Sequence, residues 1–390
     1  MRGALLAALL SSAFGHASHS HAGHGAAQHH HGHSVAPNPL PPAAQRFPLS
    51  AIHLDPTSAL AESQARNARY MLSLDSERLT CLFTSAANLT GTFEKPTCRA
   101  YDHPQYYGHY FGHYLNAMAI FLDNAAASPA GVALAAKLGG LLTTIEQVQG
   151  AWAAAGEPGY FYPYSTVSFY NLEAGRNCDP VCVPYYVWHK SLAGLIDIAA
   201  RLNATAPSLS SRARAAAVGM GNWVVDRVAG VLAKGGQAVW QNVLNTEWGG
   251  MNDALNNLFR LTGDARYLET ASSFNHWAWT APLAVRNDQL QNFHANTHIP
   301  EILGDLNGYA LTQNATQADI VHNFVDILFA NHSWATGGSN DHEWWSPPRT
   351  MLSQLVRFRS PRRTPSPNQP LANARWLTPT SAHLPPPFPH

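Results

Sequence analysis

The chain has 390 residues, 24 Lys and Arg balanced by 24 Asp and Glu, and charged residues make up only 12% of it. A nucleic-acid-binding protein normally carries a basic excess, so no nucleic-acid partner is expected. The length allows one large core or two ordinary ones, and the many Trp, Tyr and Phe residues favour buried or stacking aromatics over a charged interface.

The first 17 residues have the pattern of a secretory signal peptide. A basic start at Arg2 precedes a short apolar run, 4–14, and small residues follow around Gly15 and Ala17. This run is too short to span a bilayer. We therefore expect residues 1–17 to be a signal peptide, the protein to be secreted, and the chain to have no membrane span. Four Asn-x-Ser/Thr sequons fit a secreted glycoprotein, at Asn88, Asn203, Asn314 and Asn331.

The four cysteines form an even set, which in an exported protein predicts disulfides. They are Cys81, Cys98, Cys178 and Cys182. Three connectivities are open, and we predict the pairs Cys81–Cys98 and Cys178–Cys182 because both are local.

Residues 18–46 are predicted to be a disordered leader. Eight histidines lie between His16 and His33 among Gly, Ala and Ser, and Pro37 to Pro42 marks a linker. Such a segment cannot bury a core. Weak binding of zinc or copper by its histidines is the alternative to a plain solvated segment.

Order is expected to begin at Phe47 and to be entirely helical. Helical periodicity predicts nine helices, and no run alternates as a strand would. They cover residues 59–72, 108–122, 132–148, 192–202, 211–232, 251–261, 265–274, 299–311 and 318–328. Residues 151–184 lack this period, are rich in Gly, Pro and Tyr, and are predicted to be a long ordered loop of the kind that is often functional.

Polar turns recur between these helices, after Leu202, at Thr262 and at Thr312, the last two being 312 − 262 = 50 residues apart. A helix, a tight turn and a second helix at this period indicate stacked helical hairpins. The predicted fold is therefore all-α, as an open α-solenoid or a closed toroid of hairpins.

Three short runs of Gly, Asn, His, acidic and aromatic residues stand at helix edges, on the side away from these turns. They lie within 240–255, 292–300 and 334–345. Small residues that admit a ligand, side chains that bind hydroxyls and tryptophans that stack on sugar faces suit a carbohydrate site. Helix caps and core aromatics are the alternative for any single run. Together the runs predict an oligosaccharide or glycoprotein glycan as partner.

Carboxylates in two of the runs are candidates for acid–base chemistry. Glu343 stands before two tryptophans, and loss of hydration against indoles would raise its pKa and suit it to donate a proton. A solvated loop glutamate is the alternative. Glycoside cleavage needs a second group, and Glu247 or Asp253 could supply it. Glu247 could instead cap the helix that begins at Met251.

Histidines and tryptophans complete the candidate site. His294 and His298 are four residues apart, which would place both rings on one helical face to contact sugar hydroxyls, and two histidines alone are a weak metal signal. His189 is a further candidate contact or, alternatively, a core histidine. Trp248 and Trp345 are predicted to stack on sugar rings.

Residues 346–390 contain six Arg, no Asp or Glu and repeated Pro. We predict a disordered tail. A shifted reading frame or intron read-through is the alternative to a genuine Pro/Arg-rich continuation.

Several of these motifs resemble glycoside hydrolase family 127, whose best-known activity is β-L-arabinofuranosidase. The matching runs are 47–50, 74–79, 108–115, 183–190, 192–195, 244–252, 294–300 and 334–343. The resemblance covers about residues 47–345. It implies an (α/α)6 barrel followed by β-sandwich modules, and retaining hydrolysis of arabinofuranosides of plant-type glycans. It also implies that Glu343 is the general acid/base and that His189 and His294 contact the sugar.

The resemblance implies a cysteine nucleophile and a zinc site as well, built from a Glu-x-Cys motif and a later cysteine pair. All four cysteines of this chain precede residue 183, and Arg359 stands about where the motif's glutamate is expected. We therefore expect the zinc ligand motif to be missing, no other cofactor, a barrel incomplete at its C-terminal side, and little or no hydrolysis by this chain. A noncatalytic sugar-binding protein on the same barrel is the alternative.

Overall fold

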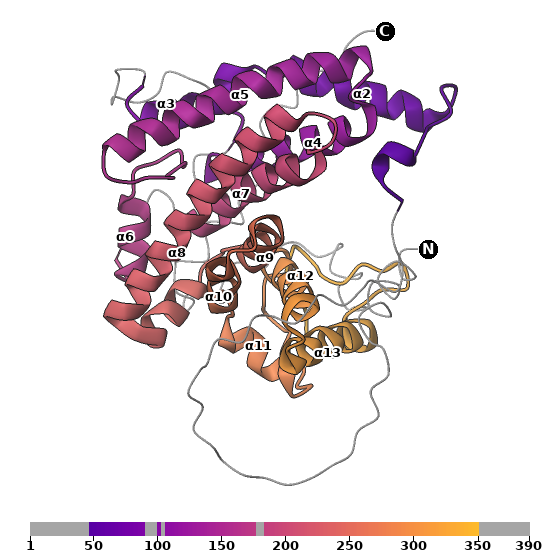
Figure 1. Cartoon of the computed structure of the whole chain (residues 1–390). Coiled ribbons are helices and arrows are strands. Elements are labelled where there is room, and N and C mark those ends of the chain that lie inside the picture. Colours follow the sequence, from indigo (N-terminus) through magenta and orange to yellow (C-terminus); the bar gives the residue numbers. More distant parts are fainter. Residues whose placement is uncertain (1–46, 90–99, 103–105, 177–182, 351–390) are drawn as a thin grey trace, which may run out of the picture.

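The computed structural model describes residues 47–89, 100–102, 106–176 and 183–350, and its regular elements are all helices (Figure 1). This confirms the all-α prediction for that part of the chain. A short 3-10 helix, η1 (Leu49–Ala51), comes first. The α-helices are α2 (Ala59–Ser73), α3 (Ser76–Ala86), α4 (His109–Ala125), α5 (Pro129–Ala154), α6 (Val167–Glu173), α7 (Pro184–Arg201), α8 (Pro207–Leu244), α9 (Met251–Thr262), α10 (Ala265–Ser273), α11 (Trp277–Ala284), α12 (Ala295–Thr312) and α13 (Ala315–Asn331).

The described residues thus hold twelve α-helices rather than the nine predicted. The three missed helices, α3, α6 and α11, have 11, 7 and 8 residues. Over so few turns an amphipathic stripe is hard to distinguish from chance. The periodicity also did not predict a kink in α8. Gly236 has φ 65° there, a left-handed conformation that only glycine adopts without cost.

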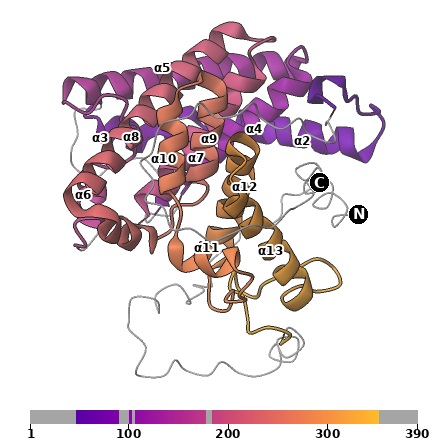
Figure 2. The same cartoon turned by 60° about the horizontal axis from the view of Figure 1, so that its bottom comes forward.

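The helices form two layers of hairpins. α4, α7, α9 and α12 pack side by side as one row, and their successors α5, α8, α10 and α13 lie behind them (Figures 1 and 2). Within the described residues the two ends of the row, α4 and α12, do not pack extensively on each other. The hairpin prediction is confirmed, whereas closure into a toroid stays a prediction.

Two of the predicted polar turns have the same construction. The residue after the last helical turn has positive φ in both, 78° at Gly263 and 57° at Gln313. The hydroxyls of Thr262 and Thr312 accept hydrogen bonds from the backbone N–H two residues on. The acidic or amide residue that follows then caps the next helix. The 50-residue spacing therefore reflects a repeated helix–turn–helix unit.

The middle of the segment predicted to be a long loop belongs to the core. Tyr160, Phe161 and Tyr162 are at most 1% exposed, and Tyr160 packs against Trp188 and Trp223. The Gly, Pro and Tyr residues suggested a functional loop. In the structure they form an irregular stretch of backbone whose aromatic rings pack in the core.

The structure continues past the predicted domain end at Trp345. The backbone N–H of Arg349 donates to the carbonyl of Asn331, so the first residues of the predicted tail are ordered. Residues 1–46 and 351–390 lie outside the described residues, and the signal peptide, leader and remaining tail stay predictions. No helix in the described part of the chain is both long and apolar enough to cross a membrane.

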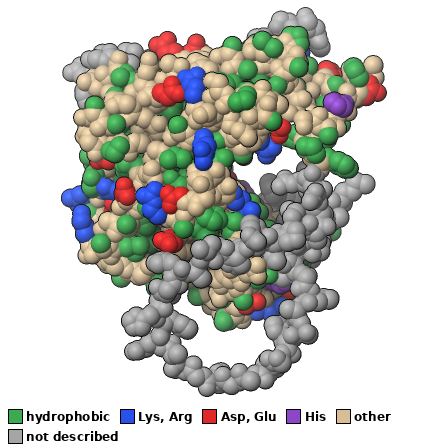
Figure 3. Space-filling model, viewed as in Figure 1, with side chains coloured by type: hydrophobic (Ala, Val, Ile, Leu, Met, Phe, Trp, Pro, Cys, Tyr) green, Lys and Arg blue, Asp and Glu red, His purple; other side chains and the backbone are tan. Residues whose placement is uncertain are grey.

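Charged side chains are sparse on the face seen in Figure 3, in agreement with the low charge content.

Candidate active site at the helix N-termini

The N-terminal ends of the four row helices, with the loop after α13, bring most of the candidate residues together. His109 at the start of α4 stacks on Tyr186 at the start of α7, with ring centroids 5.4 Å apart. His189 packs against Gly249, just before α9. Thr297 at the start of α12 is close enough to Glu247 to lower the pKa of its carboxyl. We use the name N-terminal cluster for these side chains together with two more; its members are His109, Tyr186, His189, Glu247, Thr297, His294 and Glu343.

Glu343 occupies a strained turn. The N–H of Trp344 donates to the carbonyl of Asp341 at 3.0 Å, and the two central residues, His342 and Glu343, have φ of 49° and 69°. Two positive φ values in succession are the pattern of a type I′ turn, which favours Asn-Gly and not His-Glu. Non-glycine residues held in this region cost free energy and concentrate at functional sites.

The turn is fixed to α12 and aims the Glu343 carboxyl at His294. The N–H of Ala295 donates to the Glu343 carbonyl at 2.7 Å, and Glu343 Oε2 lies 3.0 Å from His294 Nε2. The Glu343 side chain is 66% exposed, so the two following indoles do not bury it as predicted. The loop after α13 therefore meets the N-terminus of α12 at the contact between Glu343 and His294.

His294 precedes α12 as its N-cap residue, and both ring nitrogens have partners. Nδ1 lies 2.7 Å from the hydroxyl oxygen of Thr297, and Nε2 faces Glu343. The ring also packs on Trp344, with centroids 5.1 Å apart.

Glu247 lies half-buried behind this pair. Burial raises its pKa, while His294, the Thr297 hydroxyl and Lys190 act in the opposite direction. Its Oε1 is buried and has no hydrogen-bond partner among the described residues. Glu247 does not cap α9, because the N-cap position is Gly250. The negative charges of Glu247 and Glu343 are close enough to raise the pKa of Glu247 further.

Asp253, the other proposed second carboxylate, is engaged elsewhere. Asn307 of α12 donates to its Oδ1 at 2.9 Å and Asn257 donates to its Oδ2 at 3.1 Å. This amide network joins α9 to α12. Of the two acids weighed from the sequence, Glu247 is the one beside Glu343.

His189 is buried, in accordance with the alternative reading as a core histidine. Its Nδ1–H donates to the Tyr186 carbonyl at 2.5 Å, and burial lowers its pKa well below the usual value. A Cβ at Gly249 would lie 2.2 Å from the ring. The glycine expected to admit a ligand therefore makes room for this histidine.

The prediction for His298 is wrong. His298 is 7% exposed, its Nδ1–H donates to the His294 carbonyl, and its ring packs on Trp279 at 4.7 Å. Burial lowers its pKa to about 4. Residues four apart share a face only when both are helical, and His294 has the extended conformation of an N-cap.

Stacking by Trp248 and Trp345 must also be corrected, because both rings belong to the core. Trp248 is 2% exposed, and Trp345 is 1% exposed and stacks on Trp279 at 5.3 Å. Trp344, 48% exposed and beside His294, is the accessible tryptophan that sequence reasoning passed over. The adjacent pair Trp344–Trp345 alternates sides, as extended residues do, and this signal could have separated them.

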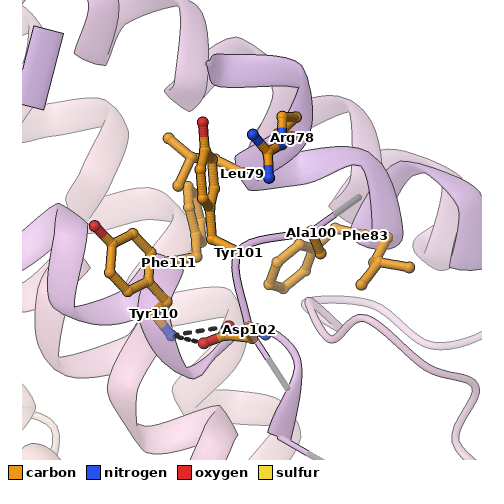
Figure 4. Close-up of a pocket in the computed structure, with 10 residues that line it drawn as sticks. Arg78, Leu79, Phe83, Ala100, Tyr101, Asp102, Tyr110 and Phe111 are labelled. Atoms are coloured by element: carbon orange, nitrogen blue, oxygen red, sulfur yellow. Dashed lines mark hydrogen bonds between the residues drawn. The ribbon is translucent and has the colours of Figure 1, made fainter. Parts of the chain in front are cut away.

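Two histidines of α4 extend the cluster toward the first hairpin. The Nε2 atoms of His109 and His113 lie 3.1 Å apart, and burial, with Lys190 and His109, lowers the pKa of His113 to about 4. Asp102 holds this end of α4 by accepting from the N–H groups of Gly108 and Tyr110 (Figure 4). The small pocket drawn there, about 10 Å³, is too small for a sugar.

Comparison with protein-family models decides the affiliation. The model of the β-L-arabinofuranosidase GH127 catalytic domain matches residues 52–357, which is most of the chain. The chain belongs to glycoside hydrolase family 127. A comparison with curated proteins finds no match. Family membership implies a glycosidase domain and a carbohydrate substrate.

The resemblance places the zinc motif of family 127 after Glu343, around Arg359, which lies outside the described residues. No three His, Cys, Asp or Glu side chains gather as metal ligands in the part of the chain that the structure describes. His294 lies within hydrogen-bond distance of Glu343 through Nε2 and of the Thr297 hydroxyl through Nδ1. Cys98, Cys178, Cys182 and Arg359 lie outside the described residues, so both predicted disulfide pairings stay predictions.

Proposed function

We propose that this family 127 domain binds an arabinofuranosyl residue of a plant-type glycan at the N-terminal cluster, with Glu343 as general acid/base. The strained turn that presents Glu343 to His294 carries the proposal. A general acid must reach the glycosidic oxygen and hold a proton until the bond breaks. The exposed Glu343 carboxyl can approach a substrate, and His294 Nε2 is placed to exchange its proton.

The remaining polar groups of the cluster are suited to hold the sugar. Asn296 is near enough to the Tyr186 hydroxyl to lower its pKa, and Lys190 Nζ lies over the Tyr186 ring at 4.6 Å. Amide, hydroxyl and ammonium groups beside an aromatic face provide both hydrogen bonds and stacking for a pentose. We assign the accessible stacking role to Trp344.

Retaining hydrolysis also needs a nucleophile, and no cysteine follows Cys182 in the chain. We therefore expect purified 1–390 to bind the sugar and to release little or no arabinose. For this reason a noncatalytic sugar-binding protein is the second candidate function. It also predicts binding of the sugar.

Calorimetric titration of 1–390 with a β-L-arabinofuranosyl oligosaccharide tests the proposal. We expect saturable binding that His294→Ala abolishes and Glu343→Gln largely retains, because glutamine keeps the shape of the carboxylate and can still hydrogen-bond His294. Arg286→Ala, an exposed change on the loop after α11, is the control and should leave binding unchanged. Absence of binding by the folded wild-type chain would refute the proposal, and efficient arabinose release would refute the expected lack of turnover.

We further propose that the protein is secreted and glycosylated. Asn203 and Asn314 are exposed at turns between paired helices, which leaves room for a glycan. Expression of the full chain in eukaryotic cells, with N-terminal sequencing and glycosidase treatment of the medium fraction, tests this. Retention of the intact N-terminus inside the cell would contradict it.

A further inference from the structure

A groove of about 710 Å³ runs along α4, the first helix of the row, between α4, α2 and the segment around η1. Side chains of α4 line it from Tyr110 to Asn124, and side chains of α2 line it from Leu60 to Met71. On both helices the lining residues recur at helical spacing, so each helix turns one face toward the groove along most of its length. The groove therefore has the length of a helix, which suits it to receive one. We call it the α2–α4 groove.

The α2–α4 groove is uncharged. No Asp, Glu, Lys or Arg is among the described residues that line it. His113, which does line it, is neutral near pH 7 because burial, with the charges of Lys190 and His109, lowers its pKa to about 4. Leu60 and Ile120 are apolar and 68% and 41% exposed. An exposed apolar surface of this extent marks an interaction site, and its lack of charge favours a partner surface that is also apolar.

The last helix of the row, α12, has an apolar stripe on its open side. Ile299, Leu303, Leu306 and Ala310 follow one another at spacings of four, three and four residues, which places them on one helical face. The packing neighbours of α12 are chiefly α9 and α13, and Leu303 is still 48% exposed. We call these four residues the α12 stripe, and it is as free of charge as the groove.

The α12 stripe and the α2–α4 groove match in length and direction. α4 has 17 residues and α12 has 18, so both helices are about 25–27 Å long. They stand at opposite ends of the row (Figures 1 and 2). All four row helices begin at the N-terminal cluster and thus run in the same direction, and α7 already packs on α4 in this way. An α12 helix from a second copy can therefore lie along the groove as a further row helix would.

The terminal segments of the chain itself suit the groove less well. Residues 346–390 contain six Arg and no Asp or Glu, whereas the groove has no carboxylate to pair with them. The segment before Phe47 is rich in His, Gly and Pro and has no sustained apolar stripe after residue 17. A second copy of the chain, by contrast, provides an uncharged apolar helix of the required length.

We propose that two copies of this chain associate, with the α12 stripe of each copy lying in the α2–α4 groove of the other. The two contacts are equivalent and are related by a two-fold axis parallel to the row helices. They join the two rows into a single ring, and the N-terminal clusters of both copies then lie at the same rim. This inference concerns association alone and does not depend on the proposed function.

Sedimentation velocity of the full chain over a range of concentrations tests the proposal. We expect the mass to rise with concentration from that of one chain to twice that value. Ile120→Glu in the groove and Leu303→Glu in the stripe each place a carboxylate in an uncharged contact, so each variant should remain a monomer. Val132→Glu is the matched control, because Val132 is 62% exposed on α5 and does not line the groove. It should associate as the wild type does.

An equimolar mixture of the two variants identifies the surfaces that meet. Ile120→Glu keeps an intact stripe and Leu303→Glu keeps an intact groove. Although neither variant associates alone, the mixture should form dimers of one copy of each through the single intact contact, more weakly than the wild type. A mixture that stays monomeric would overturn the proposal, because it would show that the stripe and the groove do not bind each other.

Thermal unfolding of each variant ensures that only folded protein is compared, and Leu60→Glu is a second groove variant at a more exposed position. A wild type that stays monomeric at every concentration would overturn the proposal. If Ile120→Glu also destabilised that monomer, the groove would be assigned to another segment of the same chain. A dimer that persists in both Ile120→Glu and Leu303→Glu would locate the contact elsewhere and would overturn the proposal as well.

Discussion

Gly249 offers a direct test of how the cluster is assembled. In Gly249→Ala the new Cβ would lie 2.2 Å from His189 Cε1 and 2.7 Å from Nδ1, far inside contact distance. The position also has φ 61°, which costs a non-glycine residue about 1–2 kcal/mol. Overpacking against a buried ring adds about 1–3 kcal/mol. Together we expect about 2–5 kcal/mol of destabilisation, a large part of the stability of an ordinary domain.

Gly175 supplies a matched control. It has φ 63°, and nothing lies within 4 Å of a Cβ built there. Gly175→Ala therefore incurs the backbone cost alone, about 1–2 kcal/mol. The difference between the two variants, measured by urea unfolding followed through tryptophan fluorescence, should be about 1–3 kcal/mol.

A double-mutant cycle with His189→Ala identifies the cause. When the imidazole is removed, Gly249→Ala should cost no more than Gly175→Ala. Equal destabilisation by the two alanine variants in the wild-type background would refute the close packing of Gly249 on His189, and with it the account of why this loop carries glycine.

Three further outcomes are expected. Burial raises the pKa of Asp305 from 3.8 to about 7, so the folded state keeps this proton to higher pH than the unfolded chain. The contribution of protonated Asp305 to the free energy of unfolding is fully present below about pH 4 and is lost as the pH rises through about 7. The loss is about 4 kcal/mol at most. Urea midpoints across that range should show a slope that Asp305→Asn reduces, and an unchanged slope would contradict the assignment. Trp345→Ala should cost about 3–5 kcal/mol because the ring is buried, whereas Trp344→Ala should leave the unfolding midpoint nearly unchanged and weaken sugar binding. The reverse pattern would restore the original assignment to Trp345. His342→Gly should raise stability by about 1 kcal/mol by relieving its positive φ, and a thermal melt that shows no gain would argue against strain in the turn.

The periodicity of the chain was sufficient to predict the helical hairpins, because an amphipathic stripe and a capped turn are local properties. The Thr262 and Thr312 turns are examples, since each threonine bonds the backbone two residues on and needs no distant partner. The long helices were likewise found, although three short ones were not. Family motifs pointed to Glu343 and His294, two side chains that the structure brings within hydrogen-bond distance.

Which side chains share a site was decided only by tertiary packing. His298 appeared to pair with His294, and Trp345 appeared equivalent to Trp344, yet one member of each pair enters the core. Sequence spacing fixes neither the non-helical N-cap before α12 nor the turn that sets adjacent indoles on opposite sides. The contact of Glu247 with Thr297, 50 residues away, arises because α9 packs on α12. Local pattern thus determined the elements and the kinds of chemistry, whereas long-range burial selected the residues that meet.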